Sequence, residues 1–164
     1  MITIVDYGMG NLGSIQNMFK RIKVESEITS DVRAIAQAKK ILLPGVGAFD
    51  AAMQMIESAG LLPVLNKKVL DDKVPTFGIC LGMQLLTKSS EEGKLPGLGW
   101  IDARTVKFNF SNNSLKIPHM GWNTVNVKRE SPLINDLPTC LEVTQDEVRL
   151  LHRYLGRQIL ALFG

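Results

Sequence analysis

A strand that runs directly into a helix through a cysteine constrains this chain more than any other feature. Residues 76–79 follow Pro75 and have the composition of a short buried strand, whereas residues 81–88 have helical character. No loop separates them, so the backbone must change direction within Gly78-Ile79-Cys80-Leu81-Gly82. Glycine takes the positive φ angles and close backbone approaches that such a corner requires. The segment therefore predicts a sharp strand–helix turn that presents Cys80 at its corner.

Short apolar strands alternate with helical segments through the first 90 residues. Strands are expected at 2–5, 26–29, 41–43 and 76–79, and helices at 12–22, 31–38, 49–60, 61–70 and 81–88. Such alternation is typical of an α/β fold, with a mostly parallel sheet flanked by helices on both faces.

The composition of the sequence changes after Glu91, where the regular alternation of strands and helices ends. Glycine and proline give way to short strand-like runs at 105–110, 115–117 and 124–127, which favour a small antiparallel part. Residues 144–164 have apolar positions at helical spacing and predict a terminal amphipathic helix. We therefore expect an incomplete main domain over 1–143 and a divergent helical tail over 144–164.

Composition excludes several classes of protein. The 164 residues are 45% hydrophobic, enough for a core without a metal or disulfide, and the net charge of +3 does not indicate nucleic acid or a membrane surface as partner. Two distant cysteines and two isolated histidines lack the spacing of metal ligands. No segment reaches the length of a membrane span, and no signal peptide is visible, so we expect a cytoplasmic protein.

The corner at Cys80 has the geometry of a nucleophile elbow with cysteine in place of serine. A thiol at a helix N-terminus is favoured as thiolate, and the backbone N–H of Leu81 points to where an oxyanion would form. The alternative is a buried structural cysteine, since free cysteines are commonly buried. Cys140 has no comparable frame and is expected to be structural.

Four segments in order carry a family resemblance: residues 6–11 (DYGMGN), 43–53 (LPGVGAFDAAM), 78–86 (GICLGMQLL) and 118–123 (PHMGWN). Together they resemble class I glutamine amidotransferases, and among these the glutaminase subunits of imidazole glycerol phosphate synthase, from histidine biosynthesis. The similarity runs from Met1 to about Leu137.

The resemblance implies a reaction and the residues that perform it. Cys80 would attack the carboxamide of glutamine, giving a glutamyl thioester, ammonia and then glutamate, with no cofactor. Gly47 would be the second oxyanion donor beside Leu81, and Gln84 would line the glutamine pocket. Residues 44–47 also suit an ordinary strand-ending turn, so this segment alone does not establish an oxyanion loop.

The resemblance also implies a partner. Ammonia would pass to a (β/α)8-barrel cyclase subunit that makes imidazole glycerol phosphate and AICAR. Asn11 and Trp122 match positions at the interface of such a heterodimer, although Trp122 also suits a core position. Met9 stands where the family often has proline.

The catalytic base is where the sequence departs from the family. Such a cysteine needs a base and an orienting carboxylate, which the family supplies from a His-Pro-Glu segment absent here. The histidines present are His119, which does not match the family's base, and His152, five residues after Glu147 on a helical segment. A frameshift, a premature stop or true divergence would each produce this tail. We expect little glutaminase turnover from the chain alone.

Two other functions stay open at this point. One is a paralogous glutaminase that feeds a sugar amidotransferase of surface polysaccharide synthesis. The other is a catalytically inactive homologue that only binds a partner.

Overall fold

The computed structural model describes residues 1–109, 125–126 and 140–141. Contacts divide the chain into two units, Met1–Lys107 and Phe108–Gly164, and the first unit holds the candidate site. No helix in the described part of the chain is long and apolar enough to cross a membrane. The expected tail at 144–164, the domain boundary before it and the strand expected at 115–117 lie outside the described residues.

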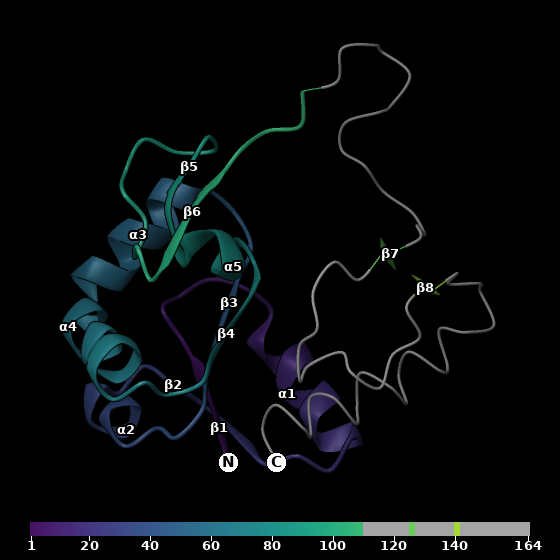
Figure 1. Ribbon diagram of the computed structural model, residues 1–164. Helices are drawn as coiled ribbons and strands as arrows, with labels where there is room; N and C mark the ends of the chain where they lie inside the picture. Colours follow the sequence, from purple (N-terminus) through teal and green to yellow (C-terminus); the bar gives the residue numbers. More distant parts are fainter. Residues whose placement is uncertain (110–124, 127–139, 142–164) are drawn as a thin grey trace. The chain divides into compact units, whose positions relative to one another are not determined.

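The first unit alternates strands and helices, as the sequence predicts (Figure 1). Its elements are β1 (Ile2–Val5), α1 (Leu12–Arg21), β2 (Ser26–Thr29), α2 (Val32–Ala36), β3 (Ile41–Gly45), α3 (Phe49–Ser58), α4 (Leu61–Asn66), the π-helical turn η1 (Lys67–Asp71), β4 (Thr76–Cys80), α5 (Leu81–Leu85), β5 (Thr87–Ser90) and β6 (Ile101–Thr105). In the second unit the described elements are β7 (Val125–Asn126) and β8 (Cys140–Leu141).

The central sheet is four-stranded and parallel, with the order β2-β1-β3-β4. The predicted α/β class with a mostly parallel sheet is therefore confirmed. Strand β3 pairs with β4 over its whole length, and Gly45 stands opposite Cys80 at the carboxyl ends of the two strands. Loops that follow parallel strands meet at this edge of the sheet, which is where α/β proteins bind ligands.

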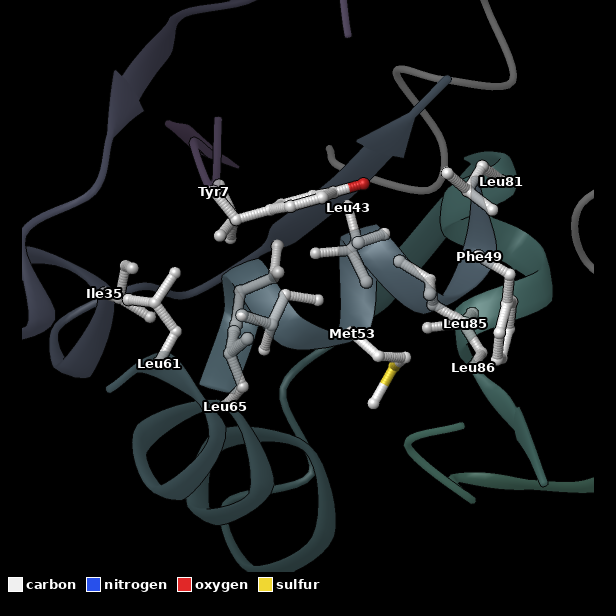
Figure 2. Packing of buried hydrophobic residues seen from close by; sticks show 14 of the residues in the cluster. Tyr7, Ile35, Leu43, Phe49, Met53, Leu61, Leu65, Leu81, Leu85 and Leu86 are labelled. Atoms are coloured by element: carbon white, nitrogen blue, oxygen red, sulfur yellow. The ribbon is translucent and has the colours of Figure 1, made fainter. Parts of the chain in front are cut away.

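Helices cover the two faces of the sheet differently. Val5, Ile41 and Leu43 face a core built with α2, α3, α4 and α5, and Phe49, Ala52, Met53 and Ile56 of α3 are all buried there, as expected. Alternate strand residues such as Ile4 and Leu42 face the other way, on the side of α1 with its buried Phe19. Figures 1 and 2 show this helix arrangement and the packed side chains.

Side-chain caps explain where two of the helices begin. Asp31 accepts hydrogen bonds from the backbone N–H groups of Arg33 and Ala34, so it caps α2 as its sequence position predicts. Asn11 accepts a hydrogen bond from the N–H of Ser14 at 3.2 Å and caps α1 in the same way. Both caps supply acceptors for N–H groups that have no partner within the helix.

The predicted helix at 81–88 is wrong in its second half. Helix α5 ends at Leu85, and β5 begins at Thr87. The Thr87 hydroxyl donates to the carbonyl oxygen of Gln84 at 2.8 Å and so satisfies a carbonyl of the last helical turn. Thr87 and the serines that follow also have weaker helix propensity than leucine.

The region after Glu91 also differs in part from the expectation. The strand expected at 105–110 is wrong, because residues 106–109 are not in a strand. The strand present is β6, which ends at Thr105 and pairs with β5 in parallel. An antiparallel pair is nevertheless present, between β7 and β8, so the predicted small antiparallel part is confirmed. A parallel β5–β6 pair requires the connection between them to run back along the strands, and this return loop over residues 91–100 shapes the candidate site.

Candidate active site

Cys80 lies at the corner between β4 and α5 with an unusual backbone conformation. Its φ is 54° and its ψ is −116°, and its side chain is exposed. A non-glycine residue in this region stores about 1–3 kcal/mol of strain, and such residues cluster at functional sites. The predicted sharp turn is confirmed, and the alternative of a buried structural cysteine is wrong.

The two glycines that flank Cys80 are required by close backbone contacts. A Cβ on Gly82 would overlap the carbonyl oxygen of Leu43 in β3. A Cβ on Gly78 would lie 2.7 Å from backbone atoms of both Gly82 and Met83. Real Cβ atoms do not approach other atoms so closely, so α5 packs directly on the backbone of β3 and β4. The Gly-x-Cys-x-Gly sequence thus follows from the packing that creates the corner.

Leu81 anchors the backbone immediately after the cysteine. It is the first residue of α5, where N–H groups have no partner within the helix. Its side chain is fully buried in the core, which fixes the direction of its backbone. This arrangement suits a donor aimed at charge that develops beside Cys80.

Gly47 lies in the loop that follows β3, at the same edge of the sheet. Because Gly45 pairs with Cys80, this loop begins directly beside the cysteine corner. Gly47 has a φ of 118°, a conformation that residues with a Cβ rarely adopt. A Cβ there would also lie 2.6 Å from the terminal methyl of Met9, which is half-buried and packs against the core. The loop therefore requires glycine, and its role as an oxyanion donor stays a prediction.

The Gln84 side chain makes two hydrogen bonds, one with the last residue of β5 and one with the loop that follows it. The Ser90 hydroxyl donates to Gln84 Oε1 at 2.8 Å, and Gln84 Nε2 donates to Glu92 Oε2 at 3.2 Å. Gln84 lies in α5, the helix that begins directly after Cys80. The Gln84 amide is thus paired with a carboxylate in the helix that begins at the cysteine corner.

Glu92 belongs to this group although no sequence pattern singles it out. Its neighbour Glu91 instead accepts a hydrogen bond from the backbone N–H of Lys107 at 2.7 Å. Which of two adjacent glutamates faces Gln84 depends on the turn after β5, for which the single sequence gives no signal.

The remaining site predictions fall into two groups. Asn11 is exposed and caps α1, and its predicted place at a partner interface is untested. Trp122, His119 and His152 lie outside the described residues, so their predicted roles stay predictions. Within the described part of the chain, no three side chains of the kinds that bind metals come together.

The sequence model of the class I glutamine amidotransferase family matches residues 3–158. With its parallel sheet and its cysteine corner, the chain belongs to this family. A solved structure described as a glutamine amidotransferase has the same fold, with a TM-score of 0.58 at 20% identity over 69% of this chain and 60% of that one.

Curated relatives narrow the comparison. The chain is 55% identical over 137 residues to imidazole glycerol phosphate synthase subunit HisH 2 of Methanococcus maripaludis, covering 84% of this chain and 67% of that protein. Identity to imidazole glycerol phosphate synthase subunit HisH 2 of Pseudomonas aeruginosa is 45% over 137 residues, which again cover 84% of this chain and 67% of that protein. Identity to HisH of Shouchella clausii is 42% over 161 residues, covering 96% and 74%. The chain thus spans about two thirds of the first two relatives.

Proposed function

We propose that this chain is the glutamine-hydrolysing subunit of an imidazole glycerol phosphate synthase and that Cys80 is its nucleophile. The observation that carries the proposal is the strained, exposed Cys80 at the end of β4, paired across the sheet with the strand that leads into the Gly47 loop. The names of the curated relatives favour histidine biosynthesis over an amidotransferase for surface sugars.

The proposed reaction has two steps. The Cys80 thiolate adds to the carboxamide carbon of glutamine, and the N–H groups of Leu81 and Gly47 stabilise the oxyanion. The carbon–nitrogen bond then breaks, the nitrogen takes up a proton and leaves as ammonia, and a glutamyl thioester stays on Cys80. Water attacks this thioester, which releases glutamate and restores the thiol.

Gln84 and Glu92 are the candidates for recognising the amino-acid end of the substrate. The Glu92 carboxylate suits the α-ammonium group of glutamine, and the Gln84 amide holds that carboxylate in place at 3.2 Å. No histidine lies within the described residues, so the group that carries the proton is to be sought outside them.

We further propose a cyclase barrel as the partner that receives the ammonia, in a cytoplasmic heterodimer. Asn11 and Trp122 are the proposed contacts on this chain. Native mass spectrometry of the chain mixed with a cyclase barrel subunit tests the partner: a one-to-one complex, weakened by Asn11→Ala, is expected. A chain that forms no complex with any such barrel would exclude this pairing.

A diazo-ketone analogue of glutamine tests the nucleophile directly. We expect one covalent adduct, mapped to Cys80 by mass spectrometry, with glutamine slowing its formation and Cys80→Ser preventing it. Equal labelling of Cys140, or no protection by glutamine, would contradict the proposal. Because the sequence contains no His-Pro-Glu, we expect labelling without comparable glutamate release; normal turnover would disprove that part.

A further inference from the structure

We propose that Asp50 is a positioning residue for glutamine, because its carboxylate holds the return loop that carries Glu92. The inference rests on the proposed function, since it concerns the pocket in which Gln84 and Glu92 would bind the substrate. Asp50 touches neither Cys80 nor Gln84 in any described hydrogen bond; it acts through the loop.

The contacts of Asp50 cross a long stretch of sequence. Its Oδ1 accepts hydrogen bonds from the backbone N–H groups of Lys94 at 2.8 Å and Leu95 at 2.9 Å, and its Oδ2 lies 3.0 Å from the Lys94 nitrogen. Lys94 is two residues after Glu92, so the clamp fixes the loop close to the carboxylate that pairs with Gln84.

The loop backbone at Gly93 packs directly against the first turn of α3. A Cβ on Gly93 would overlap Asp50 Oδ1 and would lie 2.7 Å from the Phe49 ring. Phe49 is completely buried, which fixes the start of α3 and with it Asp50. Since α3 begins directly after the Gly47 loop, one rigid helical turn holds both the proposed oxyanion loop and the Glu92 loop.

Apolar packing holds this part of the loop as well, because Leu95 and Leu98 are half-buried and pack against the core. A cavity of about 240 Å³ lies beside the next part of the loop, lined on one side by Leu95, Pro96 and Leu98 and on the other by Met53, Ile56 and Leu62. Beside this cavity the apolar packing of residues 95–98 is incomplete, so the hydrogen bonds of Asp50 add to it.

Other polar contacts hold the loop on both sides of the clamp. Before it, the N–H groups of Glu92 and Gly93 donate to Ser90 Oγ and to the Ser90 carbonyl oxygen, both at 3.2 Å. The N–H groups of Gly97, Leu98 and Gly99 donate to backbone oxygens of Lys88, Leu85 and Thr87, and Trp100 Nε1 donates to Asn66 Oδ1 at 2.7 Å. These bonds secure residues 92–93 and 97–100 and leave Asp50 as the side chain that holds the backbone N–H groups of Lys94 and Leu95. The N–H groups of Leu95 and Lys94 also lower the pKa of Asp50, so the acceptor is charged at neutral pH.

Saturation kinetics of Cys80 labelling by the diazo-ketone analogue measure the effect in the 164-residue chain. We expect Asp50→Ala to raise the half-saturating analogue concentration about tenfold or more, since tenfold is the lower limit for the loss of a hydrogen bond to a charged group. The maximal labelling rate should change less than about threefold, because Cys80, Leu81 and Gly47 keep their contacts. Asp50→Asn keeps one acceptor oxygen, so its half-saturating concentration should lie between those of the unchanged chain and Asp50→Ala. Asp71→Asn, on η1 away from the loop, is the control and should match the unchanged chain.

A double mutant separates positioning through Glu92 from a general structural effect. If Asp50 acts through Glu92, Asp50→Asn combined with Glu92→Gln should raise the half-saturating concentration no more than Glu92→Gln alone. The proposal would be overturned if the double variant raised the half-saturating concentration by the product of the two single effects. It would also be overturned if that concentration were unchanged in both Asp50→Ala and Asp50→Asn.

Iodoacetamide provides the control for folding and for the proposed function. Its reaction with Cys80 does not require glutamine recognition, so a variant that reacts with it at the unchanged rate has an intact corner. If the unchanged chain reacts with iodoacetamide but shows no saturation by the glutamine analogue, the proposed function itself fails. If the unchanged chain saturates and both Asp50→Ala and Asp50→Asn behave identically to it, the positioning role alone fails.

Discussion

The hydroxyl of Tyr7 donates a hydrogen bond to the carbonyl oxygen of Pro44 at 2.5 Å. Tyr7 follows β1, and Pro44 lies one residue before the end of β3, so the bond ties two strand ends together at the edge of the sheet that carries Cys80. Figure 2 shows the Tyr7 ring among the core side chains with its oxygen directed toward the side of Leu81. A Cβ on Gly45 would overlap this oxygen, which shows how tightly the edge is packed.

Replacing Tyr7 by phenylalanine removes this bond while keeping the ring. We expect the free energy of unfolding at pH 7, measured by urea titration, to fall by about 1 kcal/mol, the usual net value of a hydrogen bond. An unchanged free energy would mean that the Pro44 carbonyl finds a substitute donor.

The burial of Tyr7 should make the free energy of unfolding decrease at alkaline pH. Burial raises its pKa to about 12, from 10.0 in an exposed tyrosine. Above pH 10 the unfolded chain loses this proton while the folded chain keeps it, so stability is complete below pH 10 and declines as the pH rises toward 12. The decline should reach about 2–3 kcal/mol, at about 1.36 kcal/mol per pH unit.

The matched control is again Tyr7→Phe. The second tyrosine of the chain, Tyr154, is present in both proteins, so the difference between their stability–pH curves reports Tyr7 alone. Parallel curves between pH 10 and 12 would contradict the assignment of a buried, protonated Tyr7.

The parts of the fold that the sequence predicts well are those fixed by short-range pattern. Runs such as 2–5 and 41–43 are apolar and end in turn residues, so β1 and β3 are recognisable from composition alone. The corner at Cys80 is also predictable, because the two close approaches at Gly78 and Gly82 each demand a residue without a side chain.

The parts that the sequence does not predict depend on contacts between distant residues. Asp50 holds Lys94 and Leu95 across more than forty positions, and nothing near Asp50 distinguishes it from an ordinary residue of a first helical turn. The parallel pairing of β5 and β6 likewise depends on where the return loop runs. Local propensity does not encode such placements, so the sequence indicates Gln84 but not its partner Glu92.

Gly82 and Gly13 offer a matched pair of glycine substitutions. A Cβ on Gly82 would overlap the Leu43 carbonyl oxygen, so Gly82→Ala must push α5 away from the sheet. We expect a loss of about 3 kcal/mol in the free energy of unfolding and slower labelling of Cys80. Gly13 lies in α1, and apart from its chain neighbours and the backbone of its own helix the nearest atom to its Cβ position, Asn11 Oδ1, is 4.0 Å away. Gly13→Ala should therefore gain about 0.5 kcal/mol. Similar losses in both would refute the packing argument.

Strain at Cys80 can be measured by comparing alanine with glycine at that position. At an ordinary helical site such as Ala51 in α3, glycine costs about 1 kcal/mol relative to alanine, because it loses more backbone freedom on folding. At Cys80 the φ of 54° strains alanine as it strains cysteine, by about 1–3 kcal/mol, whereas glycine adopts this conformation freely.

The two effects oppose each other at this corner, and the strain should equal or exceed the entropic cost. We therefore expect Cys80→Gly to be at least as stable as Cys80→Ala in urea unfolding, while Ala51→Gly loses about 1 kcal/mol. If Cys80→Gly were instead less stable than Cys80→Ala by the same amount as at Ala51, the corner would carry no strain. A relaxed corner would also weaken the main structural argument for Cys80 as a nucleophile, because the strained turn is what holds the thiol out of the core.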